Sequence, residues 1–168
     1  MKAQKGNFCH ALQQLKDEHV KLRADMDNFY DIAEEIDFET GHEVVQLFAR
    51  LHEKMSAFTD KLKAHSRRED EGLFPIMARH LGEHDKTIEV MEFEHEKAEK
   101  HLQDFLIEAE NRGANIDEID AQTITVYAVQ AYATLTQHFA KEETVLFPMA
   151  ETILSDDEKK ELEKLFQA

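Results

Sequence analysis

Histidine and glutamate recur in this sequence at a spacing that could bind metal ions. The segments that begin at His65 and at His138 each read His-x-x-x-Glu. Residues four apart lie on one face of an α-helix, about one turn apart, so both side chains can point at a single site. Imidazole nitrogens and carboxylate oxygens, without a thiolate, suit iron, manganese or zinc. With two further histidines, the candidate ligands are His19, His65, Glu69, His95, His138 and Glu142.

The two halves of the chain repeat this pattern. The matching stretches are residues 65–75 with 138–148, at an offset of 73, and Glu18-His19 with Glu94-His95, at an offset of 76. Each half offers one lone histidine and one His-x-x-x-Glu pair, which predicts a pseudo-two-fold site for two metal ions. Two octahedral ions need about twelve ligand positions, and four histidines, two bridging carboxylates and a bridging oxide or hydroxide fill about ten. The remaining positions would admit a small molecule such as O2 or NO, and iron is the expected metal because such a site is redox-useful.

Four segments with the apolar periodicity of an α-helix must position these residues. Apolar side chains recur at alternating steps of three and four, which is the seam of a helix in a bundle. The seams cover residues 8–36, 44–69, 84–109 and 124–149. The six candidate ligands occupy seam positions and would face the core, where a polar group costs free energy unless it is paired or binds a metal.

Glycines and capping residues predict where these helices begin and end. The breaks between the seams contain Gly41, Gly82 and Gly113, and glycine is frequent at helix ends because it tolerates positive φ. Thr40 and Asp117 are candidate N-caps. Pro75 and Pro148 are expected to end or kink the second and fourth helices. A capping-box pattern that begins at Ser155 predicts a short fifth helix.

An up-down-up-down arrangement would bring the four histidines to one level. Two residues on antiparallel neighbours are level when the turn lies midway between them. The midpoints between consecutive histidines of the set fall at residues 42, 80 and 116–117. All three midpoints lie within a few residues of the glycine breaks. The sequence therefore predicts an all-α fold, an antiparallel up-down-up-down four-helix bundle with a short C-terminal fifth helix.

The composition fits a single domain over residues 1–168. Hydrophobic residues make up 42% of the chain, and Gly 5 and Pro 2 are few, which favours long helices over a loop-rich sandwich or barrel. The net charge of −16 would repel phosphate groups. Nucleic acid and anionic membrane surfaces are therefore not expected partners.

Cysteine usage and hydropathy predict a cytoplasmic protein. One cysteine excludes an internal disulfide and fits a reducing compartment. No apolar run approaches the length of a membrane span. The segment Met1–Lys5 is basic, but polar Gln13 and Gln14 follow too soon for a signal-peptide core.

The ligand pattern resembles that of the HHE cation-binding, or hemerythrin-like, family over nearly the whole chain. The resemblance rests on the six candidate ligands, with intervals of 46, 30 and 43 between the histidines and both glutamates at plus four. It implies a four-helix bundle that holds a non-haem di-iron centre. It also implies that Glu69 and Glu142 are the bridging carboxylates.

Two positions differ from the oxygen-carrying hemerythrins. Those proteins have a histidine four residues after the third-helix histidine, where this chain has Glu99. They have an aspartate five residues after the last histidine, where this chain has Glu142 at plus four and Glu143 at plus five. These differences argue against reversible O2 carriage and make Glu99 a candidate seventh ligand, or alternatively a solvated or outer carboxylate. The pattern is more similar to the bacterial branch that responds to nitric oxide and repairs iron–sulfur centres, although the cysteine-bearing N-terminal domain of many of those proteins is not seen.

Two functions stay open at this level. In one, the centre reacts with O2, NO or peroxide, or supplies iron for the repair of iron centres. In the other, the protein binds, stores or senses iron or oxygen without catalytic turnover, and a protein partner or a dimer is compatible with either. Ligand spacing does not encode the open positions or the electron source, so it does not decide whether the protein is an enzyme. A ferritin-like site is disfavoured because it needs Glu-x-x-His twice, and Glu92 with His95 supplies it once.

The remaining histidines are expected at the surface or in loops. They are His10, His42, His52, His80, His84 and His101.

Overall fold

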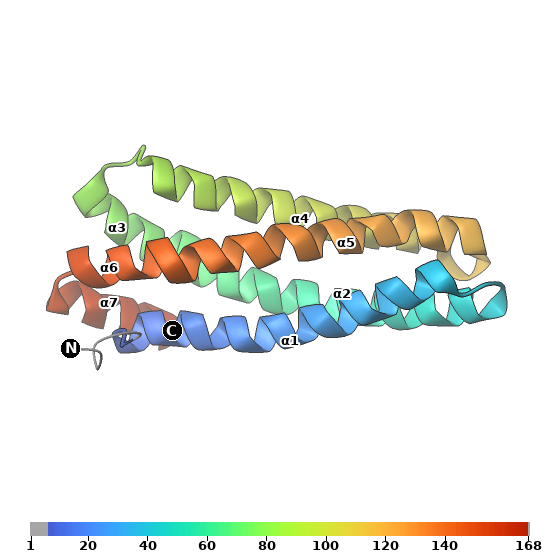
Figure 1. Ribbon diagram of the computed structural model, residues 1–168. Helices are drawn as coiled ribbons and strands as arrows, with labels where there is room; N and C mark the ends of the chain where they lie inside the picture. Colours follow the sequence, from blue (N-terminus) through green and yellow to red (C-terminus); the bar gives the residue numbers. More distant parts are fainter. Residues whose placement is uncertain (1–6, 168) are drawn as a thin grey trace.

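The computed structural model describes residues 7–167, and these residues form an all-α bundle (Figure 1). Its four long helices are α1 (His10–Phe38), α2 (His42–Arg68), α4 (Lys86–Arg112) and α5 (Glu118–Lys141). Helix α1 packs against α2 and α5, and α4 packs against α5 and α2. The predicted up-down-up-down bundle is confirmed. The segment Met1–Lys5 lies outside the described residues, and the single domain over 1–168 stays a prediction.

The glycine breaks are where the sequence placed them. Gly41, Gly82 and Gly113 follow α1, α3 and α4 with φ values of 65°, 93° and 56°. Asp117 is the N-cap of α5, as predicted, and its side chain accepts a hydrogen bond from the Asp120 N–H. The prediction for Thr40 is wrong, because Gly41 takes the N-cap position of α2 without a side-chain cap.

Helices α2 and α5 do not end at their prolines. Each continues through a π turn into a short α-helix: η2 (Glu69–Leu73) leads into α3 (Phe74–Leu81), and η4 (Glu142–Leu146) leads into α6 (Phe147–Ile153). The Phe74 and Phe147 N–H groups donate to carbonyls five residues back. Each proline then lies in the first turn of the new helix, a position that tolerates a residue without an N–H group.

The π turns shift the buried face of the chain that follows them. The fourth seam places Val145 in the core, yet 47% of Val145 is exposed and Leu146 is buried instead. Likewise Ala150 is buried, whereas the seam position Met149 is only half-buried. A π turn inserts one residue into the helical repeat, so the seam moves by one position after Glu142.

The apolar core consists of two clusters, one on each side of the histidine level. The larger cluster fills the bundle toward the turn at Gly41 and includes Phe29, Phe58 and Phe105. The smaller cluster includes residues of α3 and α6, such as Phe74 and Phe147. The six candidate ligands therefore form a polar layer between two apolar ones.

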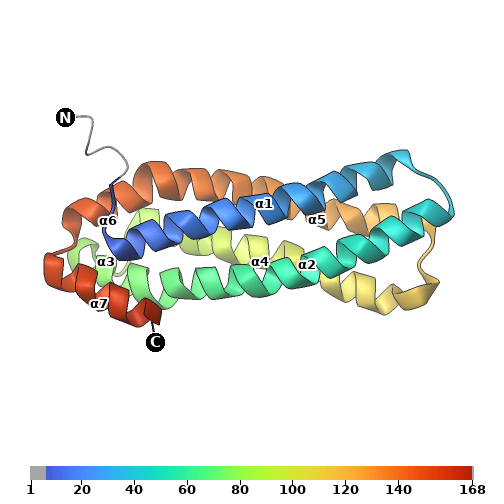
Figure 2. The same ribbon diagram turned by 90° about the horizontal axis from the view of Figure 1, so that it is seen from below.

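A last helix covers the end of the bundle. Helix α7 (Asp156–Gln167) packs against α1 and η2 (Figure 2). Its predicted capping box is present, since the Ser155 side chain accepts from the Glu158 N–H and the Glu158 carboxylate accepts from the Ser155 N–H. Within residues 7–167, none of the helices has both the length and the hydropathy to span a membrane.

Candidate metal centre

The six predicted ligands come together at one level of the bundle. Each long helix contributes one histidine, and each π turn contributes its first residue: His19 from α1, His65 from α2, Glu69 from η2, His95 from α4, His138 from α5 and Glu142 from η4. All six are buried, with at most 4% of their surface exposed. The geometry agrees with the convergence predicted from the midpoints.

The side chains form two overlapping sets of four potential ligands. One set is His19, His65, Glu69 and Glu142, and the other is Glu69, His95, His138 and Glu142, with the ligand atoms of each set within 4.8 Å of one another. Glu69 directs Oε2 to His65 Nε2 at 3.3 Å and Oε1 to His95 Nε2 at 2.9 Å. Glu142 directs Oε1 to His19 Nε2 at 3.0 Å and Oε2 to His138 Nε2 at 3.3 Å. Each carboxylate thus presents one oxygen to each set.

Most of these inward atoms have no hydrogen-bond partner. When the histidines are neutral and carry their proton at Nδ1, both oxygens of Glu69 and of Glu142 and the Nε2 atoms of His95 and His138 are buried without a donor, although His95 Nε2 lies 2.9 Å from Glu69 Oε1. A buried carboxylate in that condition is costly unless a cation or a donor satisfies it. A metal ion in each set would satisfy all of these atoms, so the donor set fits the two ions that the sequence predicts.

Every histidine of the cluster donates a hydrogen bond from its Nδ1–H group to a carboxylate. The four pairs are His19 with Glu143 at 2.7 Å, His65 with Glu18 at 2.7 Å, His95 with Asp70 at 2.9 Å and His138 with Glu94 at 2.9 Å. A proton held at Nδ1 leaves the Nε2 lone pair free to face the centre, and it fixes the ring orientation. The outer carboxylates thus prepare the histidines for metal binding.

Sequence reasoning missed the role of these outer carboxylates. A signal was present, because acidic residues precede His19 and His95 directly and follow Glu69 and Glu142 directly. The pairing itself was not visible, since Glu18 holds the histidine of α2 and not its own neighbour in sequence. Only the packing of one helix beside another decides which histidine each carboxylate reaches.

The carboxylates raise the pKa of His65, His95 and His138 in the metal-free cluster. Burial lowers the pKa of His65, but the charge of Glu69 and the hydrogen bond to Glu18 outweigh it and raise that pKa to about 10. Burial also lowers the pKa of His95, but Asp70 and Glu69 raise it to about 11. The pKa of Glu69 is held well below its ordinary value by the same histidines, against the effect of burial. A metal ion must therefore displace protons from the cluster.

Aromatic rings close the cluster on its apolar sides. Phe139 stacks on His19 with ring centroids 4.1 Å apart, and Phe147 stacks on the same ring at 5.5 Å. Phe74 stacks on His95 at 5.7 Å. These rings pack directly against the histidines, whose surfaces are at most 4% exposed.

The candidate seventh ligand, Glu99, lies outside both sets. It is half-buried and lines a surface pocket together with Lys63 and Glu96. A direct role for Glu99 at the metal stays a prediction. Glu92, the residue that would complete a ferritin-like motif, is exposed and also lies outside both sets.

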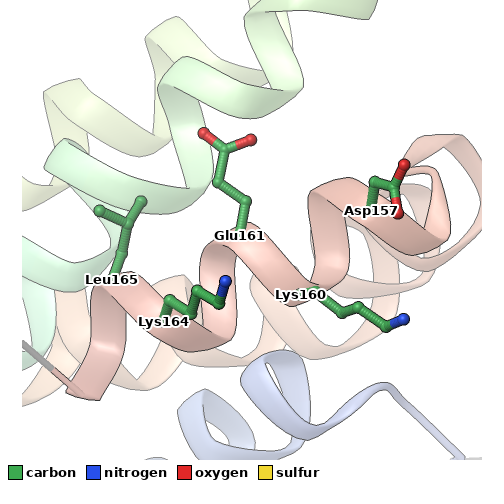
Figure 3. Close-up of a pocket in the computed structure, with 5 residues that line it drawn as sticks. All are labelled: Asp157, Lys160, Glu161, Lys164 and Leu165. Atoms are coloured by element: carbon green, nitrogen blue, oxygen red, sulfur yellow. The ribbon is translucent and has the colours of Figure 1, made fainter.

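The other histidines lie away from the cluster. His10, His42, His80 and His84 are exposed, as predicted, whereas His52 and His101 are half-buried. The His52 ring packs against Phe105, with its Nε2 buried and unpartnered. Figure 3 shows a surface pocket whose labelled residues all come from α7, among them Lys160, Glu161 and Leu165. None of them belongs to the cluster, so this pocket is not the metal centre.

Comparison with known families agrees with this geometry. Residues 10–150 match the Hemerythrin HHE cation binding domain. A comparison with curated proteins gives no significant match. The matched region contains all six clustered side chains and covers most of the chain, so the protein belongs to the hemerythrin HHE cation-binding family.

Proposed function

We propose that this hemerythrin-family protein holds two non-haem iron ions in the His/Glu cluster and uses them to react with, or to sense, a small molecule such as O2, NO or peroxide. The observation that carries the proposal is the pair of shared carboxylates. Both oxygens of Glu69 and Glu142 are buried without a hydrogen-bond partner, and each carboxylate faces both sets of histidines. Such an arrangement suits two cations that share two bridging ligands.

The count of ligands supports reactivity toward a small molecule. Each set supplies two histidine nitrogens and two carboxylate oxygens, whereas an octahedral iron ion takes about six ligands. One position on each ion would be filled by a shared oxide or hydroxide, which leaves about one position per ion for an external ligand. When bound, the iron pair would supply the redox chemistry.

The protein's own residues then orient the histidine ligands and exclude water and large molecules from the centre. The outer carboxylates accept hydrogen bonds from the Nδ1–H groups, so each histidine keeps its Nε2 lone pair toward the centre. The rings of Phe74, Phe139 and Phe147 shield the cluster from bulk water and from large substrates. The cluster has four histidines and two glutamates, and Glu99 stands where the oxygen-carrying hemerythrins have a fifth histidine, which argues against reversible O2 carriage.

Metal analysis with spectroscopy tests this function. Protein purified without added metal should contain two irons per chain and should show oxo-bridge absorption bands under air. Manganese or zinc in place of iron, or no metal at all, would refute the iron assignment. Turnover of NO or peroxide with a reductant would make the protein an enzyme, whereas stoichiometric binding without turnover would make it a sensor or carrier.

A role in handling iron for the repair of damaged iron centres is the alternative that the ligand pattern allows. In that case iron should pass from the protein to an apo iron–sulfur protein faster than to solvent. Cys9 lacks a disulfide partner, and the proposed reactions need a reductant, so we place the protein in the cytoplasm. Its expected partner is the small molecule itself; a protein partner or a second copy would serve as electron donor or iron acceptor.

A further inference from the structure

The internal repeat is broken at one corner of the cluster, the one formed by His95 and Asp70. Arg23 lies four residues after His19, and its counterpart four residues after His95 is Glu99. Arg23 Nη1 lies 2.6 Å from the Oε2 atom of Glu143, the carboxylate that holds His19. The second half therefore places a negative charge where the first half has a guanidinium.

The four outer carboxylates differ accordingly in what restrains them. Three form an ion pair with a cation: Glu143 with Arg23, Glu18 with Arg68 and Glu94 with Lys141. Asp70 forms no ion pair with lysine or arginine in the part of the chain that the structure describes. The Asp70 side chain is also 39% exposed, whereas the other three are between 15% and 21% exposed. Asp70 is thus the least restrained and most accessible of the four.

The aromatic cover is thinner at this corner as well. Phe139 stacks closely on His19, and its counterpart 73 residues earlier is Ser66. Among the described residues, the phenylalanine stacked on His95 is Phe74, at the longer distance of 5.7 Å. Behind Asp70, the His95 Nε2 atom is buried and has no hydrogen-bond partner.

Several carboxylates gather on the surface around this corner. Burial raises the pKa of Glu92, and the negative charges of Asp70, Glu89 and Glu96 raise it further. Glu99 lines the neighbouring surface pocket between α2 and α4 with the carboxylates of Glu96 and Asp104, and Lys63 and Lys100 line the same pocket. Negative charges gathered at an accessible surface attract cations and raise the local concentration of those cations.

We propose that the corner formed by His95 and Asp70 is the route by which metal ions enter and leave the cluster. The inference rests on the proposed function only in that the cluster holds two ions. A hydrated divalent cation meets Asp70 first and passes to the Nε2 atom behind it, and no ion pair of Asp70 with lysine or arginine within residues 7–167 has to break. The ion on the His95 and His138 side therefore exchanges faster than the ion on the His19 and His65 side.

Release of Fe²⁺ to a ferrous chelator tests the route. Protein loaded anaerobically with two Fe²⁺ should release them in two phases of equal amplitude. Glu99→Arg would give Asp70 an ion pair like that of Arg23 with Glu143, and it should slow the fast phase about fivefold. That factor corresponds to the free energy of about 1 kcal/mol that one exposed ion pair contributes. Arg23→Glu removes the ion pair with Glu143 and should accelerate the slow phase by a similar factor. Raised salt should reduce both effects.

A matched control separates the corner from net charge. Glu110→Arg makes the same charge change at an exposed position of α4, about 16 Å further along the helix, and should leave both phases unchanged. Glu99→Gln, which removes the charge without adding a bulky cation, should give a smaller slowing and serves if Glu99→Arg folds poorly.

Each outcome decides between the two claims. A single release phase in the parent, or unchanged rates in Glu99→Arg and Glu99→Gln, would overturn the exchange route and leave the two-iron centre standing. An iron content that falls to one in Glu99→Arg would make Glu99 a ligand and would also overturn it. Failure of the parent to bind Fe²⁺ would refute the proposed function itself.

Discussion

Replacement of Glu142 by alanine should weaken the binding of both metal ions at once. Its side chain is fully buried and belongs to both sets of ligands, with Oε1 3.0 Å from His19 Nε2 and Oε2 3.3 Å from His138 Nε2. Glu142→Ala removes one of the four protein ligands of each set. Loss of a group that only orients a ligand costs about 10- to 100-fold in metal affinity, so loss of the ligand should cost at least about 100-fold, or about 2.7 kcal/mol.

Replacement of His65 should have a more restricted effect. His65 belongs to one set, and its removal leaves Glu69, His95, His138 and Glu142 complete. Anaerobic loading with Fe²⁺, desalting and colorimetric iron analysis should give two irons per chain for the parent. We expect about one for His65→Ala and less than one for Glu142→Ala.

His52→Ala provides the control. His52 is a half-buried histidine of α2, the helix that also carries His65, and it packs against Phe105 outside both sets. The His52→Ala variant should retain two irons per chain. Circular dichroism would establish that all three variants keep the helical fold, and equal iron contents in the three variants would refute the assignment of the cluster as the metal centre.

Three further predictions concern protons, outer carboxylates and packing. Because the folded pKa values of His65 and His95, about 10 and about 11, exceed their ordinary value of 6.5, protonated histidines stabilise the metal-free fold fully below pH 6.5, and this stabilisation is lost as the pH rises through 10. Metal binding displaces these protons, so the difference in Tm between metal-loaded and metal-free protein, measured by calorimetry, should widen from pH 6 to pH 9; a constant difference would contradict this. Glu143→Gln should lower iron affinity about 10- to 100-fold in a chelator competition, whereas Glu110→Gln should not change it. Phe139→Ala should reduce the free energy of unfolding by about 3–5 kcal/mol in urea titrations of the metal-free protein, and a loss below 1 kcal/mol would show that the ring does not pack as described.

The sequence carried enough information to predict the bundle and the convergence of the six candidate ligands. Helical periodicity placed His19, His65, His95 and His138 on seams, and glycines at the breaks located the turns. Both signals are local, because helix faces and helix ends depend on neighbouring residues along the chain. In an antiparallel bundle, equal distances from a turn then bring the histidines level without further information.

Prediction from local pattern failed where the backbone departs from the regular α-helix. The seam predicted Val145 in the core, but the π turn that begins at Glu142 moved the buried face to Leu146. Thr40 lost the N-cap position to Gly41 because the turn after α1 needs positive φ at that residue. A shift of one residue follows from how the whole helix packs, and the seam spacing alone does not encode it.

Only the tertiary structure decided which groups pair across helices. The sequence determined that four histidines and two glutamates face the core at one level, since a helix fixes its own faces. It did not determine that Glu18 holds His65, or that Asp70 lacks the cation that Arg23 gives to Glu143. Those contacts join residues of different helices, so they depend on the rotation and offset of each helix against its neighbours, which side-chain packing sets after the helices have formed.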